Sequence, residues 1–221
     1  MKSEYKRFKQ YLEMLHKTVY HEPETPEFHN KLIDQLILQV IDPMLIPFDT
    51  QILDIGCGSG YWLEKMRDKG YDKLTGITYD DDDIRFCNEK NLNVLKNDFT
   101  FTELPDNYAG FIFCRQALEH SPFPMLTLLE FNRLLQKDGR AYIEVPAPDM
   151  DRKHEENINH FSILGARMWI ELYRRAGFRV EWFQELELDL QDTIDFIQVD
   201  QKEKFYCAVL TKVTDIDELD K

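Results

Sequence analysis

The first forty-eight residues carry apolar side chains at steps of three and four positions, the spacing of one face of an α-helix. This pattern predicts an amphipathic helix from Tyr5 to Val19 and a second from Leu32 to Ile41, which Pro43 ends. Prolines at positions 23 and 26 separate the two helices. We expect residues 1–48 to form a helical extension.

From position 51 onward, short apolar runs alternate with helical stretches roughly every 20 residues. Such alternation predicts right-handed crossovers and a largely parallel sheet that is covered on both faces. The expected strands are 51–55, 73–77, 93–97, 109–114 and 140–145, and the expected helices are 61–69, 81–90, 125–136 and 164–176. The apolar runs 179–188 and 204–210 follow one another without a clear helix, which predicts an antiparallel closing pair.

The composition suits one packed domain, since the chain has 221 residues and 43% of them are hydrophobic. We expect this domain at residues 49–212 and an acidic tail at residues 213–221. With 27 basic and 41 acidic residues, the formal net charge is −14. A field of that sign repels phosphate backbones and anionic lipids, so neither nucleic acid nor membrane is an expected partner.

The cysteines and the first residues bear on the compartment. The four cysteines are scattered and form no C-x-x-C pair, which is typical of a reducing environment. The opening MKSEYKRFKQ lacks the apolar core of a secretion signal, and no apolar run reaches the roughly 18 residues of a membrane span. These features predict a cytoplasmic protein.

Three glycines, Gly56, Gly58 and Gly60, alternate directly after the first expected strand. In open α/β sheets ligands bind at the carboxyl ends of strands, where this loop lies. The spacing is one residue short of the dinucleotide fingerprint G-x-G-x-x-G, and the Gly-Lys-Ser/Thr ending of a P-loop is absent. Asp54, just upstream, would repel a pyrophosphate but suits a nucleotide-like cofactor that carries a positive amino group.

The segment "LDIGCGSG" resembles motif I of the class I S-adenosylmethionine-dependent methyltransferases. Four later segments resemble further conserved segments of that family and occur in the same order: "LTGITYDDDDI", "KNDFTFTELP", "YAGFIFCRQALEH" and "LLQKDGRAYIEVP". The resemblance runs from Gln51 to about Leu210. It implies an α/β, Rossmann-like fold with a seven-stranded, mostly parallel sheet, an antiparallel last strand and helices on both faces. It also implies S-adenosylmethionine as cofactor and methyl transfer as the reaction.

The same resemblance implies a set of cofactor contacts. These are Asp54, Gly56, Cys57, Gly58, Gly60, Thr78, Tyr79, Asp98, Phe99 and Arg115. The chain departs from the family at the end of the second strand, where Thr78 replaces the common Asp or Glu. The ribose contact therefore stays open among Thr78, Tyr79 and Asp80.

Three histidines lie in segments expected near the carboxyl ends of strands, and histidine titrates in the range that suits a general base. His120 follows Glu119 in the loop after the fourth strand, which faces the methyl group in the related enzymes. His154 and His160 lie in the irregular stretch 146–161. We expect these three histidines and Glu119 to take part in catalysis. The alternatives are a capping or packing role for His120 and exposed loop positions for His154 and His160.

No metal site is expected from the sequence. Metal-ligating groups are present at Glu119, His120, His154, Glu155 and His160. None of their spacings is a metal signature such as H-E-x-x-H. The run from Asp80 to Asp83 lacks the glycine and distal glutamate of an EF-hand, so an acidic first helical turn is the favoured interpretation.

The expected function is methyl transfer to an oxygen or nitrogen of a small polar acceptor, by a monomer or homodimer, with a sugar or nucleotide-linked sugar as first choice. Alternative acceptors are a protein, a lipid or a quinone-like molecule. A scaffold that binds the cofactor without turnover is a further alternative, and a nicotinamide-dependent oxidoreductase is disfavoured by the glycine spacing. The N-terminal extension is a candidate lid, with Tyr11, Tyr20 and Phe28 either over the ligands or in the core.

Overall fold

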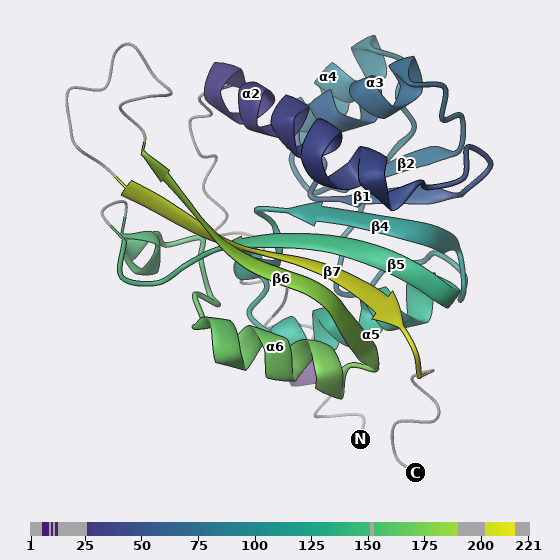
Figure 1. The fold of residues 1–221 in the computed structure, drawn as a ribbon. Helices are drawn as coiled ribbons and strands as arrows, with labels where there is room; N and C mark the ends of the chain where they lie inside the picture. Colours follow the sequence, from purple (N-terminus) through teal and green to yellow (C-terminus); the bar gives the residue numbers. More distant parts are fainter. Residues whose placement is uncertain are drawn as a thin grey trace.

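A seven-stranded sheet with the order β3-β2-β1-β4-β5-β7-β6 organises the chain (Figure 1). The computed structural model describes residues 6–8, 10, 12, 26–150, 153–189 and 202–214, without the side chains of 26–28, 188, 189 and 202. The strands are β1 (Ile52–Ile55), β2 (Leu74–Thr78), β3 (Val94–Lys96), β4 (Ala109–Arg115), β5 (Leu135–Pro146), β6 (Phe178–Asp189) and β7 (Lys202–Lys212). The helices are α2 (Pro26–Leu36), α3 (Tyr61–Asp68), α4 (Asp81–Glu89), α5 (Pro124–Leu134) and α6 (Ala166–Arg175). Short helical turns are η1 (Ile37–Ile41), η2 (Asp42–Met44), η3 (Leu118–His120) and η4 (His154–Glu156).

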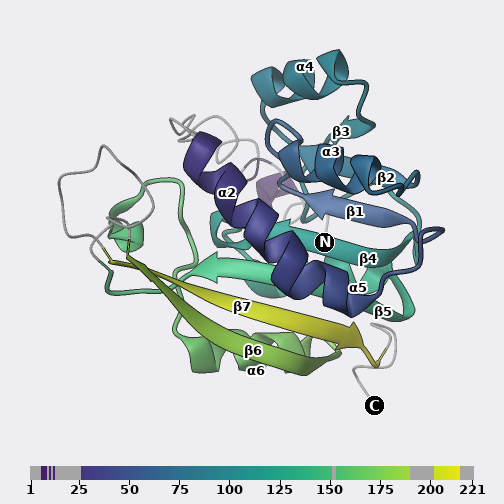
Figure 2. The same cartoon turned by 45° about the horizontal axis from the view of Figure 1, so that its top comes forward.

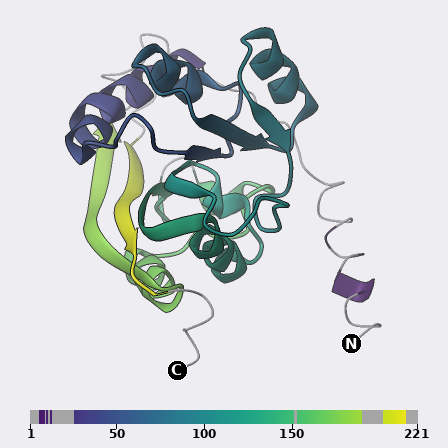
Figure 3. The same cartoon turned by 90° about the vertical axis from the view of Figure 1, so that its right-hand side faces the viewer.

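Strands β1 to β5 pair in parallel, whereas β7 lies antiparallel between β5 and β6. Figure 3 shows how the twisted sheet passes from β2 and β3 to the long β6–β7 pair at its other end. The predicted Rossmann-like sheet with an antiparallel last strand is confirmed. Because the parallel strands end at one edge of the sheet, the loops that follow β1, β2, β3, β4 and β5 meet there.

Alternation along the strands divides the core into two layers. On β4, Ile112 and Cys114 belong to the layer that α5 and α6 cover. Phe111 and Phe113 face the other layer, where Phe113 stacks on Trp62 of α3 with ring centroids 4.1 Å apart. Figures 1 and 2 show α2, α3 and α4 on one side of the sheet and α5 and α6 on the other. Both faces are therefore covered, as predicted.

The helix predicted over 125–136 is shorter in the structure, because α5 ends at Leu134 and β5 begins at once. Leu135 is fully buried and pairs with Ala109 of β4, and its carbonyl accepts a hydrogen bond from Lys212 Nζ at 2.8 Å. These contacts hold the backbone extended where helical periodicity would continue. The expected stop at Asp138 is instead an irregular point within β5, where φ is +60°.

The second predicted helix is confirmed as α2 with the π-helical turn η1, and it begins earlier than predicted, at Pro26. Of the first predicted helix, positions 6–8, 10 and 12 are described, and they are helical. Tyr11, Tyr20 and the tail residues 215–221 lie outside the described residues, and for Phe28 only the backbone is described. Within the described residues, none of the helices is long and apolar enough to cross a membrane.

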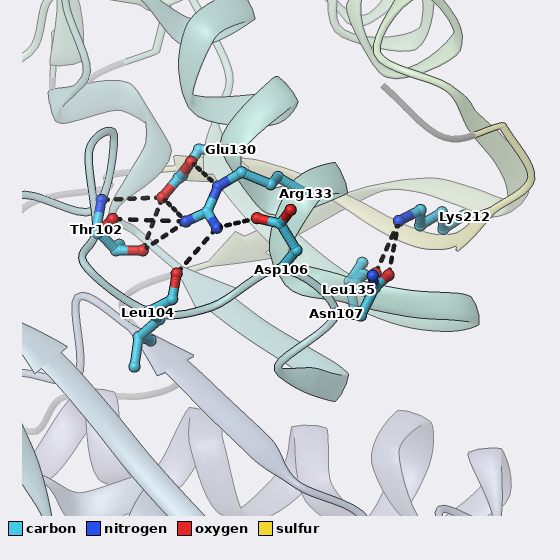
Figure 4. A network of polar contacts seen from close by, with 8 residues as sticks. All are labelled: Thr102, Leu104, Asp106, Asn107, Glu130, Arg133, Leu135 and Lys212. Carbon is cyan, nitrogen blue, oxygen red and sulfur yellow. Dashed lines mark hydrogen bonds and ion pairs between the residues drawn. The ribbon is translucent and has the colours of Figure 1, made fainter. Parts of the chain in front are cut away.

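Arg133 on α5 fastens the loop between β3 and β4 (Figure 4). Its guanidinium donates to Glu130 at 2.8 and 2.7 Å, to the Leu104 carbonyl at 2.9 Å and to Asp106 at 2.6 Å. Glu130 also accepts the Thr102 backbone N–H at 2.9 Å. Hydrogen bonding to Glu130, and then to Asp106, raises the pKa of Arg133 and keeps it charged. This network positions the loop that carries Asp98 and Phe99, two of the expected cofactor contacts.

We predict that Arg133→Ala lowers the free energy of unfolding by about 2–3 kcal/mol, because it leaves the half-buried Glu130 carboxylate without its cation. Arg174→Ala is the control, since Arg174 is exposed on α6 and pairs only at the surface with Glu171. It should change stability by less than about 0.5 kcal/mol. Urea unfolding of both variants measures the difference, and equal small effects would contradict the fastening role.

Candidate functional site

The loop after β1 passes through positive φ at Gly56 (69°), Gly58 (50°) and Gly60 (81°). A Cβ on Gly56 would lie 2.5 Å from the Cβ of Ala117. A Cβ on Gly60 would lie 2.4 Å from a methyl carbon of Leu92. Both positions combine a left-handed backbone with a close approach, so only glycine fits there.

Contacts from β2 and α4 shape this loop. The backbone N–H groups of Gly56 and Cys57 donate to the Ile77 carbonyl at 2.9 and 3.0 Å. The thiols of Cys57 and Cys87 donate to the Gly58 carbonyl at 3.6 and 3.4 Å. Interaction with Cys87, and then burial, raises the pKa of Cys57, whereas interaction with Cys57 lowers the pKa of Cys87. The loop conformation is thus determined by contacts within the chain.

Asp54 is the acidic residue of β1 next to this loop, and it is 2% exposed. Burial, and to a smaller extent the neighbouring Cys87, raises the pKa of its carboxyl well above the ordinary value. A cationic group beside Asp54 would favour the charged form. The position therefore fits a ligand with an ammonium or sulfonium group.

The residues after β2 cap α4. Asp80 accepts the backbone N–H groups of Asp82 and Asp83 at 2.8 and 3.2 Å. The three acidic residues that follow Asp80 occupy the first turn, so the interpretation as an acidic first turn is confirmed. Thr78 is buried and donates to Asp83 at 3.1 Å, whereas Tyr79 is 42% exposed. The ribose contact remains a prediction for these positions.

Asp98 and Phe99 lie in the loop after β3. Asp98 accepts the backbone N–H of Thr100 at 2.8 Å, which forms a local Asx turn, and Phe99 packs partly buried against the core. The half-exposed ring of Phe101 meets Phe8 of the N-terminal segment edge to face, with centroids 5.6 Å apart. The N-terminal extension therefore reaches the edge of the sheet at which the glycine loop lies.

At the end of β4, Arg115 forms a buried ion pair with Glu144 of β5, with 2.8 Å between Nε and Oε1. Gln116 and the Tyr142 hydroxyl also donate to Glu144, at 3.2 and 2.8 Å. Gln116 has a φ of +50°, an uncommon conformation for this residue type that is enriched at functional sites. Sequence reasoning expected Arg115 on the cofactor and missed Glu144, whose signal was an acid within the apolar run "YIEV".

The structure brings three of the predicted catalytic residues together: one ligating atom from each of Glu119, His120 and His160 lies within 4.8 Å of the other two. We call these three residues the Glu119 cluster. His120 Nδ1 is 3.0 Å from the Asn159 carbonyl, and His160 Nδ1 is 3.1 Å from the His154 carbonyl. A ring nitrogen that faces a carbonyl carries the hydrogen, so in both neutral rings the lone pair is on Nε2.

His154 lies beside the Glu119 cluster without contributing a ligating atom to it. It is 7% exposed, and its Nε2 contacts the carboxylate of Glu203, a fully buried residue of β7. Its ring stacks on His160 with centroids 5.3 Å apart. The alternative of an exposed loop position is therefore wrong for His154, because Glu203 provides a buried polar partner that lies far away in the sequence.

Segment 153–162 is fastened to η3. The backbone N–H groups of Phe161 and Ser162 donate to the Glu119 carbonyl at 2.9 and 3.0 Å, and the Ser162 hydroxyl donates to the Ser121 carbonyl at 2.8 Å. Ala117, which packs against Gly56, immediately precedes η3. The glycine loop and the Glu119 cluster are therefore linked through one short stretch of chain.

A hollow of about 590 Å³ lies at the opposite edge of the sheet, where its lining includes Thr50, Lys73, Gly110 and Arg140. These residues lie at or just before the starts of strands, or at the irregular start of β5. The glycine loop and the Glu119 cluster follow strand ends. The hollow is therefore not part of the candidate site. We identify that site by the glycine loop, the buried Asp54 and the Glu119 cluster.

Comparison with known proteins gives a consistent result. A family model described as a methyltransferase domain matches residues 20–197. The tRNA U34 carboxymethyltransferase of Pseudomonas fluorescens strain Pf0-1 is 30% identical over 156 residues, which are 62% of this chain and 48% of that protein. The chain thus spans about half the length of the curated relatives it matches.

Two solved structures illustrate the fold. An S-adenosylmethionine-dependent methyltransferase from Archaeoglobus fulgidus superposes with a TM-score of 0.66 at 20% identity, covering 85% of this chain and 97% of that one. The [4+2]-cyclase SpnF superposes with a TM-score of 0.65 at 16% identity, covering 84% and 82%. At such identities the likeness shows the fold alone.

We predict that Gly60→Ala weakens the binding of S-adenosylmethionine at least about tenfold, because the added Cβ must displace Leu92 or distort the loop. Gly165→Ala is the matched control, since no heavy atom outside its chain neighbours lies within 4 Å of its added Cβ. Calorimetric titration of both variants measures the effect. Equal affinities in Gly60→Ala and wild type would contradict the proposed role of the loop.

Asp54→Asn should make the ligand-free protein more stable at pH 8 by about 1–2 kcal/mol while weakening the binding of S-adenosylmethionine. A carboxyl whose pKa is raised on folding contributes stability below its ordinary pKa and loses it as pH rises through the raised value. The variant's advantage should therefore shrink as the pH falls towards 4. Urea unfolding from pH 4 to 8 tests this, and a pH-independent difference would contradict it.

Proposed function

The chain belongs to the methyltransferase-domain family, whose fold and cofactor are those of the S-adenosylmethionine-dependent enzymes, and from this premise we propose that it transfers a methyl group to an oxygen or nitrogen of a small polar acceptor. The observation that carries the proposal is the contact of Gly56 with Ala117. It joins the loop suited to the cofactor to the loop that bears Glu119 and His120. Cofactor and acceptor groups would thus meet at one edge of the sheet.

The residues present fit S-adenosylmethionine. Gly56, Gly58 and Gly60 let the chain turn tightly at the end of β1, where ligands of such sheets bind, and Asp54 is a buried acid suited to a positive amino group. Asp98 and Phe99 are the proposed adenine-side contacts. When bound, the cofactor supplies an electrophilic methyl group on a sulfonium. The chain's own task is then to align the acceptor and to take up its proton.

We propose that the Glu119 cluster takes up the proton that the acceptor loses. His120 donates from Nδ1 to the Asn159 carbonyl, which leaves the Nε2 lone pair to accept a proton from the acceptor. His160 packs edge to face on His120, and His154 positions His160 through its ring and its carbonyl. In this proposal Glu119 and His120 act beside the acceptor, and His154 is a positioning residue.

The surroundings of the Glu119 cluster favour a compact acceptor. Segment 153–162 is short and bound to η3, and its Ile158 and Phe161 side chains are 74% and 47% exposed. A sugar or nucleotide-linked sugar would offer hydroxyls to the histidines and a face to these apolar groups. Residues 1–48 as a lid, residues 49–212 as the catalytic domain, a cytoplasmic location and a monomeric or dimeric state belong to the same proposal.

A second candidate acceptor is a tRNA nucleotide, and the curated relatives favour it through their name. The charge supports the small molecule instead, because a net charge of −14 opposes a polyanion. The charge of Arg115 is balanced by Glu144, which favours a neutral methyl over a transferred group with a carboxylate.

We predict that His120→Gln lowers kcat about 100-fold or more while the affinity for S-adenosylmethionine changes less than about threefold. The assay uses S-adenosylmethionine labelled in the methyl group, with nucleotide-sugars, free sugars, small phenols and amines, and total tRNA as acceptors. Label in a small acceptor, lost in His120→Gln, is the expected result. Label in tRNA alone would favour the second candidate, and cofactor binding without transfer to any acceptor would favour a non-catalytic scaffold.

A further inference from the structure

We propose that Glu119, His120 and His160 form a binding site for one divalent transition-metal ion, with Zn²⁺ as the best match. The inference deepens the proposed function and rests on it, because the ion would lie where the acceptor is expected. The sequence argued against a metal since no spacing matched a known signature. Folding removes that objection, because segment 153–162 returns His160 to the loop after β4.

The donor set is that of a catalytic rather than a structural site. Two imidazoles and one carboxylate are ligands that Zn²⁺ accepts readily, and three protein ligands leave a fourth position for water or substrate. The same set with open positions also suits Fe²⁺. Ca²⁺ and Mg²⁺ prefer oxygen ligands, so two histidines disfavour them.

The distances require a small adjustment. Bonds from Zn²⁺ to nitrogen or oxygen measure roughly 2.0–2.2 Å, so two ligating atoms on one ion lie at most about 4.2 Å apart and about 3.4 Å apart in a tetrahedron. In the structure the three ligating atoms lie within 4.8 Å of one another. Closing on an ion thus takes about 1 Å of movement, which a small shift of the half-buried His120 and His160 side chains together with their carbonyl partners would supply.

Both histidines are already oriented as metal ligands commonly are. A ligating imidazole usually donates its other ring N–H to a carbonyl or carboxylate, which fixes the ring and its tautomer. His120 and His160 each present Nδ1 to a backbone carbonyl, of Asn159 at 3.0 Å and of His154 at 3.1 Å. His160 Nε2 also accepts a hydrogen bond of 3.3 Å from the amide of Asn157, which an ion would replace.

The carboxylate lies in a buried position. Glu119 is 1% exposed and its neighbour Leu118 is fully buried, whereas His120 is half-buried. A divalent ion beside this buried carboxylate would be shielded from solvent, which strengthens the attraction between the two opposite charges. The backbone carbonyl of Glu119 accepts two N–H groups from segment 153–162, so the carboxylate is held on a rigid support.

The site would activate an acceptor hydroxyl. With the ion bound, His120 Nε2 would be a ligand and no longer the base, so the ion would take over the activation of the acceptor. Bound at the fourth position, the hydroxyl would lose its proton to solvent more readily, because the ion stabilises the resulting alkoxide. The oxygen would then form a bond with the methyl carbon as the bond between carbon and sulfur breaks. The electron pair stays on sulfur, and S-adenosylhomocysteine leaves. No oxidant or reductant is involved.

The test is a titration of chelator-stripped, full-length protein with Zn²⁺ by calorimetry and with Co²⁺ by visible absorption. Wild type should bind one equivalent with micromolar or tighter affinity. Glu119→Gln and His160→Gln should each weaken binding at least about tenfold. Glu171→Gln, an exposed carboxylate on α6, is the matched control and should bind as wild type does. S-adenosylhomocysteine binding by each preparation reports that it is folded.

Each outcome decides between the two proposals. One equivalent bound, with selective loss in the two variants, supports the metal site. Absence of binding, or equal binding in wild type and both variants, overturns it, and S-adenosylhomocysteine binding with metal-independent methyl transfer would then leave the proposed function intact. If folded wild type binds no adenosyl ligand, the proposed function fails whatever the metal does.

Discussion

The contact between Gly56 and Ala117 is the constraint on which the site depends. A side chain at position 56 would come within 2.5 Å of Ala117, so the loops after β1 and β4 can approach only because one of them has no Cβ. That approach sets how far the glycine loop lies from η3. Glu119 and His120 belong to η3, and Glu119 in turn holds segment 153–162. The absence of a side chain at position 56 thus lets the proposed cofactor loop lie next to the residues proposed to act on the acceptor.

Buried charged groups are arranged in two different ways around the candidate site. Arg115 and Glu144 form an ion pair at the ends of β4 and β5, and the carboxylate of Glu203 contacts His154 Nε2. In both pairs the charged group has a partner within the chain. Asp54 is buried at the glycine loop, where desolvation raises the pKa of its carboxyl. A cationic ligand would stabilise the charged form of such a desolvated carboxyl.

Local sequence patterns predicted much of the fold and part of the candidate site. Each of three features depends on residues close together in the sequence, so spacing was enough to find it: the glycine loop, the acidic first turn of α4 and the closing strand pair. The end of α5 was not predictable, because Leu135 becomes extended through contacts with Ala109 and with Lys212, the latter 77 positions away. The same holds for His154, whose partner Glu203 is 49 positions away. For the Glu119 cluster, the residue types could be proposed but not their convergence, which needs the folded segment 153–162.

The central claim is that the loop from Gly56 to Gly60 holds an adenosyl cofactor and not a dinucleotide. Calorimetric titration of the purified chain with S-adenosylmethionine, S-adenosylhomocysteine and NADH tests it most directly. We predict saturable binding of both adenosyl ligands at one site per chain and no binding of NADH. Binding of NADH, or of none of the three by protein that circular dichroism shows to be folded, would contradict the account.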